Sequence, residues 1–267
     1  MSDASILSVL RERAGATPDD VAYTFTDYDH DWDGVTESVT WAQLYRRTLN
    51  VAHELRMHGV PGDRALIIAP QGLAYIVGFL GAMQAGFIAV PLSVPLPGSH
   101  DERVSAVITD TSPTVVLTTA AAFDIAAQNV DDGASMVAVI AVDTLDLDAD
   151  RDFDEEVPPG PDIAYLQYTS GSTRLPAGVM ISHRNLRVNV EQLLADLLSQ
   201  HGGELPPGST LVSWLPFYHD MGLVLGIAVP IFSGHKADLM SPIAFLTRPV
   251  RWLQALSRNN PAWSAAP

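Results

Sequence analysis

Apolar and polar residues in the first half of the chain follow two patterns that alternate with each other. Short runs are apolar on both faces, as in strands buried inside a sheet, and between them apolar residues recur at the three- and four-residue spacing of helices. Strands and helices in alternation predict an α/β fold with largely parallel sheets flanked by helices. The predicted strands cover residues 64–69, 87–92, 115–118 and 136–142, and the predicted helices cover residues 73–80, 101–109 and 120–128.

The N-terminal region predicts a helix over residues 2–13 and a strand over residues 21–26. A longer helix follows, which Thr40 caps and which ends near His58, before Gly59.

An acidic turn with aspartates at alternate positions lies between two strands expected around Tyr23 and Val39. Its sequence matches the start of a calcium-binding loop at Asp29, Asp31, Asp33 and Gly34. The twelfth position of such a loop falls on Thr40, where calcium needs a bidentate glutamate. We therefore interpret the stretch as a solvated turn between strands, with calcium binding as the alternative.

A second acidic stretch covers residues 143–161 and ends in three prolines. A metal cluster is the alternative here, but the stretch contains no histidine and its acids lack a ligand spacing. We interpret it as a solvated linker. The linker would end a first α/β subdomain over residues 1–158. Residues 159–267 would then form the start of a second α/β subdomain, incomplete at its C-terminus.

A loop rich in hydroxyl groups follows a predicted strand at residues 164–168 and precedes an apolar run at residues 179–181. Its residues are Thr169, Ser170, Gly171, Ser172, Thr173 and Arg174. Backbone N–H groups, hydroxyls and a guanidinium together form a cradle for an anion such as phosphate. The loop lacks the lysine of a Walker loop and the spacing of a dinucleotide-binding glycine motif. An ordinary Ser/Thr-rich hairpin turn is the alternative.

A second unusual cluster follows a predicted strand at residues 210–215, after a helix expected over residues 183–200 that Ser182 caps. It contains His219, Asp220, Met221 and Gly222, preceded by two aromatic residues. In this architecture ligands bind beyond the carboxyl ends of the strands, so the cluster is a candidate binding site. A hydrogen-bonded structural histidine is the alternative.

Composition and charge narrow the range of functions. The chain has 267 residues, 47% of them hydrophobic and 17% charged, as in ordinary globular proteins. Its formal net charge of -16 opposes binding to nucleic acid and other polyanions. The sequence has no cysteine, no run long enough for a membrane span and no secretory signal pattern, so we expect a cytoplasmic protein without disulfides or thiolate metal sites.

Taken together, the two clusters resemble the first two core motifs of the adenylate-forming superfamily. They read YLQYTSGSTRLPAGVMISHRN at residues 165–185 and SWLPFYHDMGL at residues 213–223. Further similarity extends over nearly the whole chain, in VTWAQL at residues 39–44, MQAGFIAVPL at 83–92 and MSPIAFLTRPVRWL at 240–253. Most members have a glycine and a lysine where this loop has Arg174 and Ala177. These departures resemble the fatty acyl-AMP ligases that supply polyketide synthases in lipid biosynthesis.

The resemblance implies ATP-dependent activation of a fatty acid. The products would be acyl-AMP and pyrophosphate, and the acyl group would pass to an acyl carrier protein of a polyketide synthase. By matching positions, Thr169 to Arg174 would hold the β- and γ-phosphates, with Mg²⁺ shared among phosphate oxygens. His219 would stand between the nucleotide and acyl sites, and Asp220, Met221 and Gly222 would shape the pocket mouth. No residue of this chain is assigned as a metal ligand.

The same resemblance implies that further machinery lies outside this chain. In the family the adenine-binding segment, the acidic magnesium motif, the ribose-binding aspartate and the catalytic lysine all follow later. We therefore expect an N-terminal portion that is inactive by itself, with no complete catalytic set. Two alternatives stay open, namely a piece of an acyl-CoA ligase and a non-catalytic module.

Overall fold

A computed structural model describes residues 5–96, 101–130, 137–151, 160–169, 176–198, 202 and 205–265. The chain divides into two compact units, each assembled from separate segments. The first unit contains the N-terminal residues to Tyr45, Gln71–Leu73 and the chain from His183 onward, and the second contains Arg46–Pro70 and Ala74–Ser182. This division differs from the predicted one at residue 158, because strand pairing joins segments that are far apart in the sequence.

The first unit is built on a five-stranded sheet with the order β11-β9-β10-β1-β2. The strands are β1 (Val21–Asp27), β2 (Val35–Thr40), β9 (Thr210–Ser213), β10 (Lys236–Met240) and β11 (Ala262–Trp263). All neighbours are parallel except β1 and β2. The pairing of β1 with β10 places the N-terminal strand in the sheet of the C-terminal segment.

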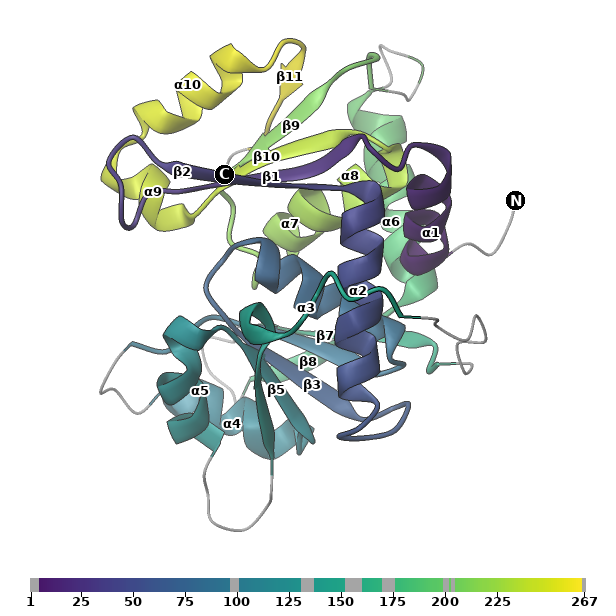
Figure 1. Cartoon of the computed structure of the whole chain (residues 1–267), viewed down its shortest axis with the longest axis vertical. Coiled ribbons are helices and arrows are strands. Elements are labelled where there is room, and N and C mark those ends of the chain that lie inside the picture. Colours follow the sequence, from purple (N-terminus) through teal and green to yellow (C-terminus); the bar gives the residue numbers. More distant parts are fainter. Residues whose placement is uncertain are drawn as a thin grey trace. The chain divides into compact units, whose positions relative to one another are not determined.

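Helices cover both faces of this sheet, with α9 and α10 on one side and α6, α7 and α8 on the other (Figure 1). Their bounds are α1 (Ile6–Ala16), α6 (His183–Leu197), α7 (Asp220–Leu223), α8 (Val229–Ser233), α9 (Pro242–Thr247) and α10 (Val250–Arg258). Helix α2 (Trp41–Leu55) contributes residues to both units.

The second unit is built on a six-stranded sheet with the order β6-β5-β3-β4-β7-β8. Its elements are β3 (Arg64–Ile68), α3 (Leu73–Gln84), β4 (Ile88–Leu92), α4 (Glu102–Thr111), β5 (Val115–Thr118), α5 (Phe123–Val130), β6 (Ala138–Ala141), β7 (Ile163–Thr169) and β8 (Ala177–Ser182). Apolar side chains of α4 and α5 pack with those of β3, β4 and β5 in one buried cluster. Only β8 is antiparallel to its neighbour. The two sheets confirm the predicted α/β class.

The acidic turn near the N-terminus joins β1 and β2, which confirms the predicted pair of strands. Asp27 accepts a hydrogen bond from the backbone N–H of Asp29, and Asp31 accepts one from Asp33, both at 2.8 Å. These carboxylates therefore bond to the backbone of their own turn. Gly34 adopts a φ of +85°, in the left-handed region that favours glycine.

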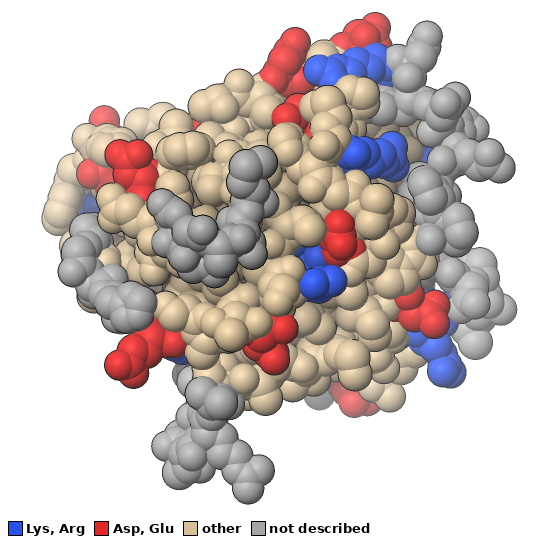
Figure 2. All heavy atoms as spheres, turned by 90° about the horizontal axis from the view of Figure 1, so that it is seen from below, with Lys and Arg blue, Asp and Glu red and all other residues tan. Residues whose placement is uncertain are grey.

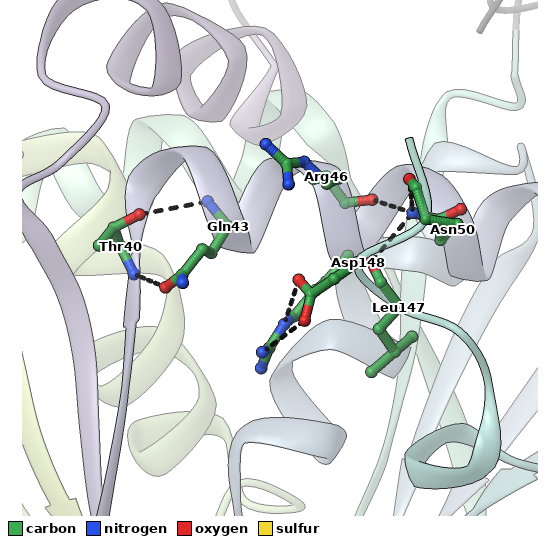
Figure 3. Close-up of polar contacts among 8 residues, drawn as sticks. Thr40, Gln43, Arg46, Asn50, Leu147 and Asp148 are labelled. Carbon is green, nitrogen blue, oxygen red and sulfur yellow. Dashed lines mark hydrogen bonds and ion pairs between the residues drawn. The ribbon is translucent and has the colours of Figure 1, made fainter. Parts of the chain in front are cut away.

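The start of α2 has the reciprocal hydrogen bonds of a capping box (Figure 3). The hydroxyl of Thr40 accepts from the backbone N–H of Gln43, at 3.3 Å, and the side-chain oxygen of Gln43 accepts from the N–H of Thr40, at 2.9 Å. This confirms Thr40 as the cap, although the helix ends at Leu55, earlier than predicted.

In the described first part of the predicted solvated linker, residues 143–151, the aspartates are exposed, but the backbone and one carboxylate are bound to α2. The Asn50 amide donates to the carbonyls of Leu147, at 2.9 Å, and Ala149, at 3.0 Å (Figure 3). Asp148 accepts two hydrogen bonds from Arg47, at 3.0 and 2.9 Å. We call residues 145–151 the strap, because two side chains of α2 fix it in place. Residues 152–159 lie outside the described part of the chain.

Charged side chains are scattered over the face drawn in Figure 2, where neither sign forms a continuous field among the described residues. In the same described part of the chain, no helix is both long enough and apolar enough to cross a bilayer.

Candidate functional site

The hydroxyl-rich loop starts at the end of β7, at the carboxyl edge of the parallel strands of its sheet. Thr169 is the last residue of β7, is exposed and pairs with Ala177 of β8. Ser170, Gly171, Ser172, Thr173 and Arg174 lie outside the described residues, so their contacts with phosphate stay a prediction. The described base of the hairpin fixes where both ends of the loop lie.

Tyr168 anchors this base. Its hydroxyl donates a hydrogen bond to the carboxylate of Asp110 in α4. Burial, and then the contact with Asp110, raise the pKa of this hydroxyl, so that it stays a protonated donor. The ring lies against Gly178, where a β-carbon would be 2.8 Å from the ring carbon Cζ of Tyr168. No pattern in the sequence points to Asp110, because its partner lies 58 residues away.

The histidine cluster follows β9, at the carboxyl edge of the other sheet. His219 directly precedes α7, and its N–H donates to the carbonyl of Pro216 at 3.1 Å. The side chains of His219, Asp220 and Met221 are all exposed. They are available for contact with a ligand, which agrees with their prediction as site residues but does not test it.

Gly222 has a different place from its three neighbours, because it is buried. A β-carbon at this position would lie 2.0 Å from the carbonyl oxygen of Pro216. Only glycine therefore lets α7 pack this closely against the chain that precedes it. Gly222 positions the exposed residues beside it.

Helix α7 continues through a π-helical segment, Val224–Ala228, into α8. The hydroxyl of Tyr23 in β1 donates to the carbonyl of Ile227 in this segment, at 2.6 Å. Burial holds the pKa of Tyr23 well above its ordinary value, which keeps the donor protonated. Segments with π geometry are frequent at functional sites.

Two further residues, which the sequence did not single out, organise the carboxyl edge of the first unit's sheet. The Trp214 ring stacks on Phe245 of α9, with centroids 3.9 Å apart and planes 5° apart. The Gln71 side chain hydrogen bonds to two backbone groups beyond β9 and to the carbonyl of Met240, the last residue of β10. An isolated tryptophan or glutamine carries no such signal in a single sequence.

Among the described residues, no group of three or more histidine, aspartate or glutamate side chains is placed to hold a metal ion. The described chemistry therefore consists of hydroxyl, imidazole, carboxylate and backbone groups at the carboxyl edges of two sheets. Such groups can bind phosphate and carboxylate ligands.

Comparison with known families gives a match over almost the whole chain. The model for AMP-binding enzymes matches residues 10–267. FadD28 of Mycobacterium tuberculosis, a long-chain-fatty-acid–AMP ligase, is 55% identical over 269 residues, which cover 100% of this chain and 46% of that protein. FadD21 of Mycobacterium leprae, which carries a provisional fatty-acid–CoA ligase name, is 60% identical over the same shares. The chain thus spans less than half the length of these relatives.

Solved structures agree with this match. A fatty acid AMP ligase from Legionella pneumophila superposes with a TM-score of 0.83 at 32% identity, covering 98% of this chain and 44% of that one. A fatty acyl-adenylate ligase from L. pneumophila, in complex with acyl adenylate and pyrophosphate, gives 0.82 at 31% over the same shares. The chain belongs to the family of AMP-binding enzymes.

Proposed function

We propose that this chain is the N-terminal part of a ligase that activates a fatty acid with ATP, forming acyl-AMP and pyrophosphate. The observation that carries the proposal is the placement of both motifs immediately after strands β7 and β9, at the carboxyl edges of two α/β sheets. The 55% identity to a long-chain-fatty-acid–AMP ligase supports the substrate class. The similarity to a ligase in complex with acyl adenylate and pyrophosphate supports the reaction.

In the proposed reaction a carboxylate oxygen of the fatty acid attacks the α-phosphorus of ATP. The new carboxylate–phosphorus bond forms as the bond to the β-phosphate oxygen breaks, and pyrophosphate leaves. The carboxylate is already ionised at neutral pH, so the step needs no general base. Catalysis then depends on positioning and charge neutralisation.

The residues of this chain have two parts in that scheme. Thr169, Ser170, Gly171, Ser172, Thr173 and Arg174 bind the β- and γ-phosphates, while His219, Asp220 and Met221 line the adenylate and acyl sites. Gly222 holds the latter segment in place by its packing. Mg²⁺, when bound, would neutralise charge on the phosphate oxygens. We place the reaction in the cytoplasm, as the sequence predicts.

The identity of the acyl acceptor is the more specific part of the proposal. Arg174 and Ala177 resemble the acyl-AMP ligase branch, which favours transfer to an acyl carrier protein of a polyketide synthase. The fatty-acid–CoA ligase name of the 60% identical relative favours coenzyme A as the second candidate.

One experiment distinguishes the two acceptors. The full-length protein that contains this chain is incubated with ATP, a ladder of fatty acids, coenzyme A and a phosphopantetheinylated carrier protein, and the products are identified by mass spectrometry. We expect acyl-AMP and acylated carrier protein. Efficient formation of acyl-CoA would show that coenzyme A, and not the carrier protein, is the acceptor. Absence of acyl-AMP under all conditions would refute adenylation.

A further inference from the structure

The side-chain amide of Gln71 bonds to three backbone groups at the carboxyl edge of the first unit's sheet. Its nitrogen donates to the carbonyl of Leu215, at 3.2 Å, and to that of Met240, at 3.0 Å. Its oxygen accepts from the backbone N–H of Phe217, at 3.2 Å. Both hydrogens of the amide and one lone pair are therefore used.

The three partners come from the two segments that end neighbouring parallel strands. Leu215 and Phe217 lie just beyond β9, and Met240 is the last residue of β10. Beyond a strand end the sheet ladder no longer pairs backbone groups, so side chains, water or other backbone groups satisfy them. An amide suits this position because it offers donors on one side and an acceptor on the other.

Further contacts also hold the chain between Phe217 and α7, among them the ring contact of Tyr218 with His219 and the close packing of Gly222 against Pro216. Tyr218 is half-buried, His219 is exposed and the N–H of His219 is held by the carbonyl of Pro216. Gln71 thus bonds on both sides of Pro216, at Leu215 and at Phe217. These two bonds, together with the close packing of Gly222 against Pro216, set the direction in which His219 leaves the sheet.

We propose that Gln71 is a positioning residue for the segment that carries His219, and through it for the adenylate and acyl sites. The inference rests on the proposed function for its catalytic consequence. Its structural consequence, the fixed path of residues 214–219, is independent of any activity.

The structural consequence can be measured in the 267-residue chain by hydrogen–deuterium exchange. Gln71→Met keeps the side-chain length but removes all three hydrogen bonds. We expect exchange in residues 214–219 to rise about tenfold, because the Phe217 amide loses its acceptor. Residues 210–213 of β9 should keep their protection, because the ladder to β10 and β11 is untouched. Unchanged exchange at 214–219 would overturn the proposal.

Gln71→Glu provides a second variant with a pH signature. Its carboxylate would face the carbonyls of Leu215 and Met240, whereas its protonated form can donate to one of them and still accept from Phe217. Because these carbonyls disfavour the charged form, the pKa of the introduced glutamate should rise from its ordinary value of about 4.3, and exchange at 214–219 should be faster at pH 7 than at pH 5, after correction for the intrinsic pH dependence. Gln254→Glu on the exposed face of α10 is the matched control, since it adds the same charge away from the site.

The catalytic consequence needs the full-length protein and an assay of ATP–pyrophosphate exchange. We expect Gln71→Met to lower kcat by up to about 100-fold through misplacement of the site, with a much smaller change in the KM for ATP. Gln71→Glu should regain part of the lost kcat, relative to wild type at the same pH, as the pH falls from 7 to 5, and Gln254→Glu should behave like wild type. A kcat of Gln71→Met equal to that of wild type would overturn the catalytic part of the proposal. If the wild-type protein forms no acyl-adenylate, the proposed function fails. The hydrogen–deuterium exchange measurement still decides whether Gln71 positions residues 214–219.

Discussion

At the scale of single residues, the two motifs combine side chains that can meet a ligand with side chains that hold them in place. His219 is exposed, whereas Gly222, three residues later, is buried against Pro216. Tyr168 is buried and anchored, whereas Thr169, the next residue, is exposed. Sequence similarity marks all four positions alike, and only the packing separates the two roles.

Gly222→Ala tests the packing role. The added β-carbon would lie 2.0 Å from a backbone oxygen, which cannot move without shifting the segment that carries His219. We expect a loss of about 1–3 kcal/mol in the free energy of unfolding, measured by urea denaturation. Gly15→Ala in α1 is the control, because nothing lies within 4 Å of its added β-carbon and alanine favours helix. Equal stability of the two variants would contradict the observed packing.

Arg174→Ala tests the ligand-binding role of the loop in the full-length protein. Arg174 would make a charge-assisted contact with phosphate, and such contacts contribute about 1.5–3 kcal/mol. We expect kcat/KM for adenylation to fall by roughly 10- to 100-fold while the melting temperature stays unchanged. Arg184→Ala, which removes an equal charge from an exposed position of α6, should retain activity. Unchanged kinetics in the Arg174 variant would remove this residue from the site.

At the scale of elements, the strap shows what a charge pattern leaves out. Alternating aspartates at residues 146–150 are typical of solvated segments. The strap is bound to α2 through Arg47, which bonds Asp148, and Asn50, which bonds two backbone carbonyls. Arg47 and Asn50 lie three positions apart and so share one face of that helix. Nothing in the sequence links that face to a segment about 100 residues later. The strap therefore belongs to the folded second unit.

Asp148→Asn tests the strap through its pH dependence. Hydrogen bonding to Arg47 holds the pKa of Asp148 below its usual value of 3.8. A lowered pKa stabilises the folded state at pH values above the usual pKa. This contribution is lost as the pH falls through the lowered pKa. The side chain is 52% exposed, so we expect a loss of only about 0.5–1 kcal/mol at pH 7.

The measurement is urea denaturation of wild type and variant at pH 7 and near pH 2. The difference between the two proteins should shrink at the lower pH, where Asp148 of the wild type becomes protonated. Asp146→Asn is the control, because the Asp146 side chain is exposed in the same segment. A difference that stays the same at both pH values would show that the ion pair is not its source.

Periodicity predicted most of the elements but not the way they combine. The strand at Val115–Thr118 has the predicted bounds, and the hairpin around the hydroxyl-rich loop is present as β7 and β8. The pairing of β1 with β10 could not be predicted, because a side-chain pattern identifies a buried strand without naming its neighbour. The short helices α9 and α10 each begin at or directly after a proline and are too brief for a helical period to stand out.

At the scale of the whole molecule, the two segments proposed to bind ligands follow strands at the carboxyl edges of separate sheets. The loop after β7 belongs to the second unit and the His219 segment belongs to the first. The family resemblance assigns each segment a part in the proposed reaction, and it places the nucleotide-binding and lysine groups later in longer proteins. Whether the two sheets fold is therefore a separate question from whether the chain contains every group of the proposed site.

This separation leads to a prediction for the 267-residue chain alone. Adenylation relies on several groups that position ATP and neutralise charge together, and removing groups that act as a unit abolishes most of the rate. We expect no ATP–pyrophosphate exchange from this chain with any fatty acid, and readily measured exchange from the full-length protein at equal concentration. The chain should nevertheless unfold cooperatively in urea, because both sheets have buried cores. Exchange catalysed by the short chain would mean that the groups needed for adenylation lie within these 267 residues, so that His219 and the loop after β7 would carry more of the chemistry than the family resemblance assigns to them.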